Sequence, residues 1–248
     1  MKVCLVFSCP QPVTLPTSYN HILQAAVLAW LQDKEYTTFL HDTGYQRERR
    51  TFKLYSFSKL LGVHTINKKT GRITFREKVC VYISSYINEM EEFVIKSIDA
   101  KRPLRLGNVF LPIEEAYFID DLYESCFVQA VSPITIHSTF QLPTGTKKTY
   151  YYNPMEKDFS IMLRDNLIRK YQAVYEKEPD NTEFSLVPLQ DGSLRKEVLK
   201  YRDTIIEGWL GRFFMSGSPE LIQMALLAGA GARNSMGFGC LVQIEKVI

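Results

Sequence analysis

Long apolar segments are missing from this 248-residue sequence. No stretch approaches the roughly 18 apolar residues of a membrane-spanning helix. The apolar run KVCLVFS near the N-terminus is too short for a secretory signal peptide, and no small-residue cleavage site follows it. Because 46% of the residues are hydrophobic, the chain can bury a substantial core. We therefore expect a cytoplasmic protein of mixed α and β structure.

Closely spaced cysteine pairs are scarce as well. Five cysteines are scattered along the chain, and only Cys4 and Cys9 lie near each other in the sequence. A disulfide framework or a zinc site would need several closely spaced ligands, so neither is expected from this pattern. We expect reduced thiols, no metal and no cofactor.

A large excess of one charge sign is also absent. The chain carries 30 basic and 27 acidic residues, which gives a net charge of +3. A balance this close to zero does not demonstrate a nucleic-acid partner, because the distribution of charge matters more than its sum. Evidence for function must therefore come from local motifs.

The same order of strand-like and helix-like segments occurs in both halves of the chain. Apolar β-type runs and two helical segments follow one another as β-α-β-β-α-β over residues 1–121, and again over residues 122–248. The segment 194–201 fits either a strand or a helix. This order predicts an α+β fold of two tandem ferredoxin-like units with those bounds, facing each other by their sheets. The predicted helices cover residues 22–32, 88–98, 153–171 and 218–229.

A glycine-rich loop, GAGARNSMGFG, occupies residues 229–239 after a helix that Ser218 is expected to cap. One glycine would suffice to end that helix, whereas four indicate a backbone that needs positive φ or lies very close to another segment. Successive amide groups in such a loop can bind an anion. We predict binding of a phosphate backbone, with a purely structural turn as the alternative. The predicted binding residues are Gly229, Gly231, Arg233, Asn234, Ser235, Gly237 and Gly239.

This loop resembles the C-terminal glycine-rich motif of the RAMP superfamily of CRISPR-associated RNA-binding proteins, in the form found in their repeat-processing endoribonucleases. Further segments are similar to that family, so the resemblance spans nearly the whole chain. It implies two ferredoxin-like folds and metal-independent cleavage of CRISPR precursor RNA within the repeat. The implied partner is CRISPR repeat RNA, with other effector-complex subunits or a second copy of the chain left open. The similar segments are YNHILQ at 19–24, FLHD at 39–42, PMEKDF at 154–159 and NLIRKY at 166–171.

Cleavage of this kind uses the 2′-hydroxyl of the RNA as nucleophile and leaves 5′-hydroxyl and 2′,3′-cyclic phosphate ends. It needs a group that moves protons near neutral pH, which suits histidine, and cations beside the phosphate. Of the four histidines, His21, His64 and His137 are expected to be packing or surface residues. His41 falls where the family places its histidine, in a stretch expected to be flexible, so the resemblance assigns it the catalytic role.

Basic residues follow His41 closely. Four of them, against one acidic residue, lie between positions 47 and 53, which indicates a local basic patch; a solvated loop is the alternative. Where relatives carry a tyrosine in the first helix this sequence has Leu28, and an arginine-rich stretch replaces their lysine. Partners for His41 are therefore proposed on chemistry alone. They are Tyr45 and one of the cations Arg47, Arg49, Arg50 and Lys53.

Two other functions stay open on the sequence. A non-catalytic RAMP subunit that binds and carries guide RNA would need the glycine loop but not His41. A metabolic ferredoxin-like enzyme would leave the loop without a role. The aromatic run at residues 150–152, beside Lys147 and Lys148, is a further and weaker candidate for RNA contact.

Overall fold

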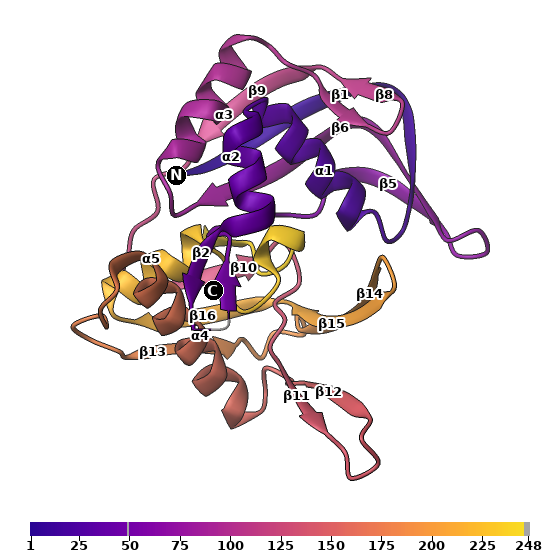
Figure 1. Cartoon of the computed structure of the whole chain (residues 1–248). Coiled ribbons are helices and arrows are strands. Elements are labelled where there is room, and N and C mark those ends of the chain that lie inside the picture. Colours follow the sequence, from indigo (N-terminus) through magenta and orange to yellow (C-terminus); the bar gives the residue numbers. More distant parts are fainter. Residues whose placement is uncertain (49, 246–248) are drawn as a thin grey trace.

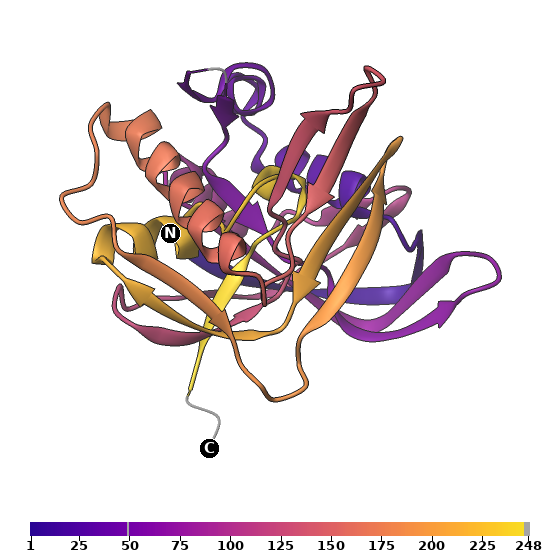
Figure 2. The same ribbon diagram turned by 90° about the horizontal axis from the view of Figure 1, so that it is seen from below.

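The computed structural model describes residues 1–48 and 50–245, apart from the side chains of His41 and Asp42. Arg49, one of the predicted basic residues, lies outside the described residues. Each half of the chain forms an antiparallel sheet with helices against it, and several hairpins project from this body (Figures 1 and 2). Over the described residues, no helix combines the length and the apolar character that crossing a membrane requires.

The N-terminal half has the predicted β-α-β-β-α-β order. Its strands pair antiparallel in the order β4-β6-β1-β9. The strand β5 pairs with the part of the long strand β6 that does not pair with β4. Two small strands, β7 and β8, form a separate hairpin before β9. The elements are β1 (Lys2–Pro16), α1 (Asn20–Leu31), β4 (Tyr55–Phe57), β5 (Leu61–Asn67), β6 (Arg72–Ser85), α3 (Glu89–Asp99), β7 (Leu104–Leu106), β8 (Val109–Leu111) and β9 (Ile113–Phe118).

The C-terminal half repeats this arrangement with the sheet order β13-β16-β10-β17, again antiparallel. In both sheets the strands lie in the order second, third, first and fourth of their unit, which is the ferredoxin-like topology. The fold prediction is confirmed. The elements are β10 (Cys126–Ala130), α4 (Lys157–Tyr175), β13 (Phe184–Pro188), β16 (Arg212–Gly217), α5 (Pro219–Leu227) and β17 (Leu241–Ile244). The division into domains at residues 121 and 122 falls between β9 and β10 and stays a prediction.

Each half has its own apolar core between sheet and helices. In the C-terminal half, Phe159, Leu163 and Leu167 of α4 are fully buried against the sheet residues Phe213 and Met215. Their spacing of four residues places them on one helix face, as the sequence predicted. Burying each such side chain stabilises the fold by about 1.5–3 kcal/mol. Helix α4 is thereby fixed, which matters because it carries a residue of the candidate site.

The segment between α1 and β4, which includes the stretch around His41 that was expected to be flexible, contains regular secondary structure. It forms the short helix α2 (Lys34–Thr38), one π-helical turn η1 (Phe39–Thr43), and a hairpin of β2 (Tyr45–Arg47) and β3 (Arg50–Phe52). Asp33 caps α2, because its side chain accepts a hydrogen bond from the amide of Tyr36. The hairpin reaches from the N-terminal half to α4 of the C-terminal half (Figure 1).

Two further hairpins belong to the C-terminal half (Figure 2). One consists of β11 (His137–Gln141) and β12 (Lys147–Tyr151), and the other of β14 (Arg195–Tyr201) and β15 (Thr204–Leu210). The segment 194–201, which fitted strand or helix, is therefore a strand. Its pairing with β15 decides the matter, since a cross-strand partner outweighs local helix propensity.

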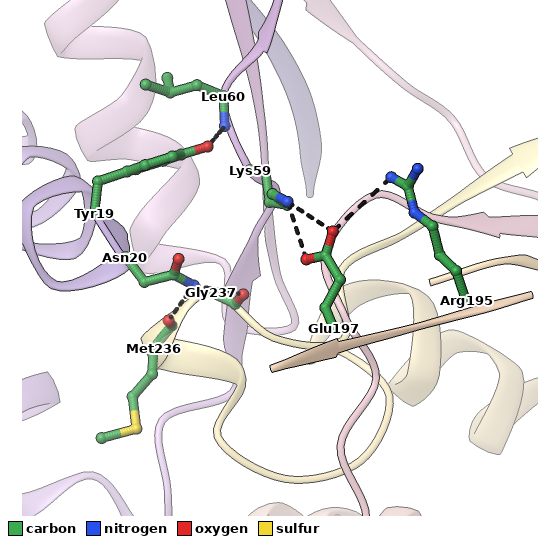
Figure 3. A network of polar contacts seen from close by, with 8 residues as sticks. All are labelled: Tyr19, Asn20, Lys59, Leu60, Arg195, Glu197, Met236 and Gly237. Carbon is green, nitrogen blue, oxygen red and sulfur yellow. Dashed lines mark hydrogen bonds and ion pairs between the residues drawn. The ribbon is translucent and has the colours of Figure 1, made fainter. Parts of the chain in front are cut away.

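Several polar contacts join the two halves, and Figure 3 shows two of them. Asn20, at the start of α1, donates hydrogen bonds through Nδ2 to the carbonyl oxygens of Met236 (3.1 Å) and Gly237 (3.2 Å). Lys59 forms an ion pair of 2.9 Å with Glu197 on the β14–β15 hairpin. A cleft of about 810 Å³ lies between the N-terminal and the C-terminal sheet and is lined by residues of both halves. The expected arrangement, in which the sheets face each other, is therefore present at this cleft.

Candidate nucleic-acid interface

The glycine loop, residues 229–239, connects α5 to β17 and packs too tightly to accept most side chains. Gly239 has φ +70°, and a Cβ built there would overlap a backbone carbonyl oxygen across the loop and lie 2.7 Å from Nδ2 of Asn234. A Cβ on Gly231, which has φ +79°, would lie 2.5 Å from the carbonyl oxygen of Thr135. These two glycines therefore have a structural role, whatever the loop also binds.

A buried lysine side chain makes three hydrogen bonds to the loop. Lys170 on α4 is 2% exposed, and its Nζ lies 2.6 Å and 3.0 Å from the carbonyl oxygens of Gly229 and Gly231. The third acceptor is Oδ1 of Asn234, at 2.8 Å. All three N–H groups of the ammonium are thereby satisfied, which a buried lysine requires.

Asn234 completes this internal network. Its Nδ2 donates to the carbonyl oxygens of Ala230 (3.2 Å) and Phe238 (3.1 Å), while its Oδ1 accepts from Lys170. The side chain is 8% exposed. Its amide is thus engaged inside the loop, so direct RNA contact by Asn234 stays a prediction that the geometry does not favour.

A cleft of about 410 Å³ opens beside the loop, between α4 and the segment made up of β3 and the residues that follow it. No aspartate or glutamate occurs among the described residues that line it, whereas arginine and lysine come from three different segments. Such a cleft has a positive potential and attracts anions. Its lining residues are Arg50, Thr51, Phe52, Lys53, Leu54, Tyr55, His137, Asn166, Lys170, Gly231, Ala232, Arg233, Asn234 and Ser235.

The cations of this cleft affect its one described histidine. The pKa of His137 is lowered, first by burial and then by the positive charges of Arg233 and Arg50. A neutral imidazole therefore faces the cleft at neutral pH. Arg233 itself has φ 60°, a left-handed conformation that costs a non-glycine residue about 1–2 kcal/mol. Such outliers gather at functional sites, which is consistent with a binding role for this arginine.

The cleft brings together two sets of residues that the sequence analysis proposed separately. Arg50 and Lys53, proposed as partners of the catalytic histidine, line it together with Arg233, Asn234 and Ser235 of the glycine loop. Gly231 is also part of the lining. The other three glycines, Gly229, Gly237 and Gly239, belong to the loop but not to this surface.

Tyr45 and Arg47 on β2 are not among the lining residues of the cleft. Tyr45 is half-buried, its ring packs edge-on against Phe39, and burial raises the pKa of its hydroxyl. The Nε of Arg47 is buried without a hydrogen-bond partner among the described atoms. Their assignment to the catalytic group stays a prediction.

His41 lies in the π-helical turn η1, and its side chain is outside the described part of the structure. The preceding residue, Leu40, lines a smaller hollow of about 220 Å³. Lys53, Tyr55 and Ser235 line both this hollow and the larger cleft. The backbone of the proposed catalytic segment is therefore close to the cationic cleft, and the catalytic role of His41 stays a prediction.

Sequence reasoning did not propose His137, Asn166 or Lys170 as residues of the site, although all three line the cleft. His137 was expected to be an ordinary strand residue, yet it begins β11 and faces the cleft. Asn166 and Lys170 are separated by four residues, so they share one helix face, and both are buried. The sequence did contain a signal for them, since both are polar residues on the side of α4 that is buried. Buried polar residues need specific partners, so such positions point to a specific contact.

Two ferredoxin-like units with a glycine loop beside a cationic cleft are the arrangement that the resemblance to the RAMP superfamily implies. A family model described as "CRISPR associated protein Cas6, C-terminal" matches residues 119–242, and the chain belongs to this family. The chain is 27% identical over 251 residues to "CRISPR-associated endoribonuclease Cas6 1" of Methanocaldococcus jannaschii, and the match covers 99% of this chain and 93% of that protein.

Solved structures agree on the fold. A structure described as "Characterization of a Cas6-related gene from Pyrococcus furiosus" matches with a TM-score of 0.83 at 20% identity, over 100% of this chain and 99% of the other. Another, described as "An RAMP protein binding different RNA substrates", matches with a TM-score of 0.80 at 19% identity, over 99% of this chain and all of the other. Both likenesses establish the tandem ferredoxin-like architecture.

Proposed function

We propose that this protein is an endoribonuclease that cleaves CRISPR precursor RNA within the repeat and leaves 5′-hydroxyl and 2′,3′-cyclic phosphate ends. The observation that carries the proposal is the cationic cleft, which joins the glycine loop to Arg50 and Lys53 from the other half of the chain. The relatives' endoribonuclease names support an enzyme rather than a carrier subunit. The RNA repeat is the proposed partner; a homodimer or other effector subunits are further proposals.

The chemistry follows from the residue types around the cleft. The 2′-hydroxyl loses its proton as it attacks the adjacent phosphorus, the bond to the 5′-oxygen breaks, and that oxygen takes up a proton. His41 is proposed to transfer a proton in this step, since an imidazole titrates near neutral pH. Lys53 and Arg50 are proposed to stabilise the charge that develops on the phosphate, and Arg233 and Ser235 to hold the RNA backbone.

The test is incubation of the purified protein with the repeat RNA of its own genome in the presence of EDTA. Cleavage at one position, with a cyclic phosphate on the 5′ fragment, is expected. Replacing the nucleotide before the cut by its 2′-deoxy analogue removes the nucleophile and should abolish cleavage of that RNA. Tight binding without cleavage would instead establish the non-catalytic carrier.

A further inference from the structure

The ammonium group of Lys170 donates hydrogen bonds to the glycine loop, although Lys170 lies on a helix about 60 residues earlier in the chain. Its three acceptors come from the first half of the loop: the carbonyl oxygens of Gly229 and Gly231, and Oδ1 of Asn234. An ammonium has three N–H donors, which match three acceptors. A neutral amine has two donors and a lone pair, so one acceptor would face that lone pair and be repelled.

None of these acceptors is a carboxylate, so the charge of Lys170 has no counter-ion among its hydrogen-bond partners. The elements that pack against α4 or line the cleft carry several titratable or charged groups, although strand β13 carries none. These groups are Tyr45 and Arg47 on β2, Arg50 on β3, Lys53 after β3, His137 on β11, Glu220 in the first turn of α5, and Arg233 in the loop.

We propose that Lys170 is a positioning residue for RNA binding: its ammonium fixes the glycine loop in the shape that presents Arg233 and Ser235 to the RNA backbone. The inference rests on the proposed function, because it concerns the RNA of that reaction. Lys170 is itself buried and acts through the loop rather than by touching the RNA. The expected ligand is therefore the phosphate backbone of the repeat RNA, bound at the cationic cleft.

The position of Lys170 also couples RNA binding to protonation. Burial lowers the pKa of Lys170 to about 7 in the free protein. Bound phosphates bring negative charge close to the cleft, which favours the charged lysine and raises this pKa in the complex. A group whose pKa is higher in the complex supports binding fully below its free pKa, and that support is lost as the pH rises through the bound value. RNA affinity should therefore fall above about pH 7.

The experiment measures the dissociation constant by fluorescence anisotropy between pH 6 and 9. The probe is repeat RNA with a 2′-deoxynucleotide at the cleavage site mapped with wild type, so that binding is seen without cleavage. In wild type, the dissociation constant should rise by up to roughly tenfold per pH unit above pH 7. Lys170→Met should bind roughly tenfold or more weakly at pH 6.5, because fewer molecules hold the binding-competent loop, and its profile should lack this rise.

Two matched variants separate this role from general effects. Arg169→Met removes one positive charge at the adjacent position of α4 and should keep the wild-type rise with pH. His137→Gln should keep it as well, because the proposal assigns the rise to Lys170; loss of the rise in His137→Gln would assign it to this histidine of the cleft and overturn the coupling to Lys170. Wild-type affinity and pH profile in Lys170→Met would overturn the proposal, as would loss of the rise in Arg169→Met.

Hydrogen exchange provides a readout in the free protein that needs no RNA. The amides of Ala230 and Ala232 donate to Gly239 and Thr135 within and beside the loop. In Lys170→Met they should exchange faster while the amides of both sheets stay protected. If Lys170→Met does not fold, wild type should show faster exchange of these two amides at pH 9 than at pH 6, after correction for intrinsic rates. No difference would refute the proposal, and wild type that neither binds nor cuts RNA would refute the proposed function instead.

Discussion

Gly239→Ala tests how strongly the glycine loop depends on its backbone shape. The new Cβ would overlap a carbonyl oxygen and lie 2.7 Å from Nδ2 of Asn234, at a φ of +70°. Overpacking of this kind costs about 1–3 kcal/mol, and left-handed backbone at a non-glycine residue costs about 1–2 kcal/mol more. The expected loss is roughly 2–5 kcal/mol, a large part of the stability of a typical domain. Because Asn234 must move, the hydrogen bonds between Lys170 and the loop should be disrupted, and RNA binding should weaken as well.

Thermal unfolding followed by circular dichroism measures the first effect, with Gly192→Ala as the matched control. Gly192 has φ +74°, but a Cβ there meets nothing within 4 Å, so the control isolates the conformational cost from the collision. For a protein of this size each kcal/mol lowers the melting temperature by roughly 2–4 °C. Gly239→Ala should therefore melt several degrees below Gly192→Ala. Equal melting temperatures would refute the claim that close packing explains this glycine.

Three further predictions concern the site and the junction between the halves. His41→Ala should slow single-turnover cleavage by roughly 10²–10⁴-fold while RNA affinity changes little, because a proton-transfer group acts in the transition state; cleavage at the wild-type rate would remove His41 from the mechanism. Arg233→Ala should weaken RNA binding and lower the salt dependence of log Kd by roughly one phosphate contact; an unchanged salt slope in anisotropy titrations would leave Arg233 outside the interface. In a double-mutant cycle by urea unfolding, Lys59→Met and Glu197→Gln should show a coupling energy of about 1 kcal/mol or less that shrinks at high salt; a coupling indifferent to salt would contradict an ionic origin.

The sequence was sufficient to predict the repeated β-α-β-β-α-β order, because its signals are local. Ser218 caps α5 as expected: its hydroxyl accepts a hydrogen bond from the amide of Leu221, and Pro219 occupies the first turn. The apolar face of α4 is equally clear from its spacing. Features of this kind depend on neighbours within one or two helical turns.

Features that depend on distant partners were not predictable in the same way. The turn η1 and the β2–β3 hairpin form in the stretch around His41 that was expected to be flexible, and β2 contacts α4 of the other half. The role of Lys170 depends on carbonyl oxygens about 60 residues later, which no local pattern indicates. The glycine loop was identified from its composition, but the segments that crowd its glycines come from tertiary packing alone.

The hydrogen bonds from Asn20 to Met236 and Gly237 link positions separated by 216 and 217 residues. Translation proceeds from the N-terminus, so α1 is synthesised long before the residues to which Asn20 donates these hydrogen bonds. The first half of the chain can therefore fold early, whereas the cationic cleft can form only after residues 229–239 have been synthesised. Contacts this distant in sequence form slowly, so acquisition of RNA binding should lag behind the folding of either sheet.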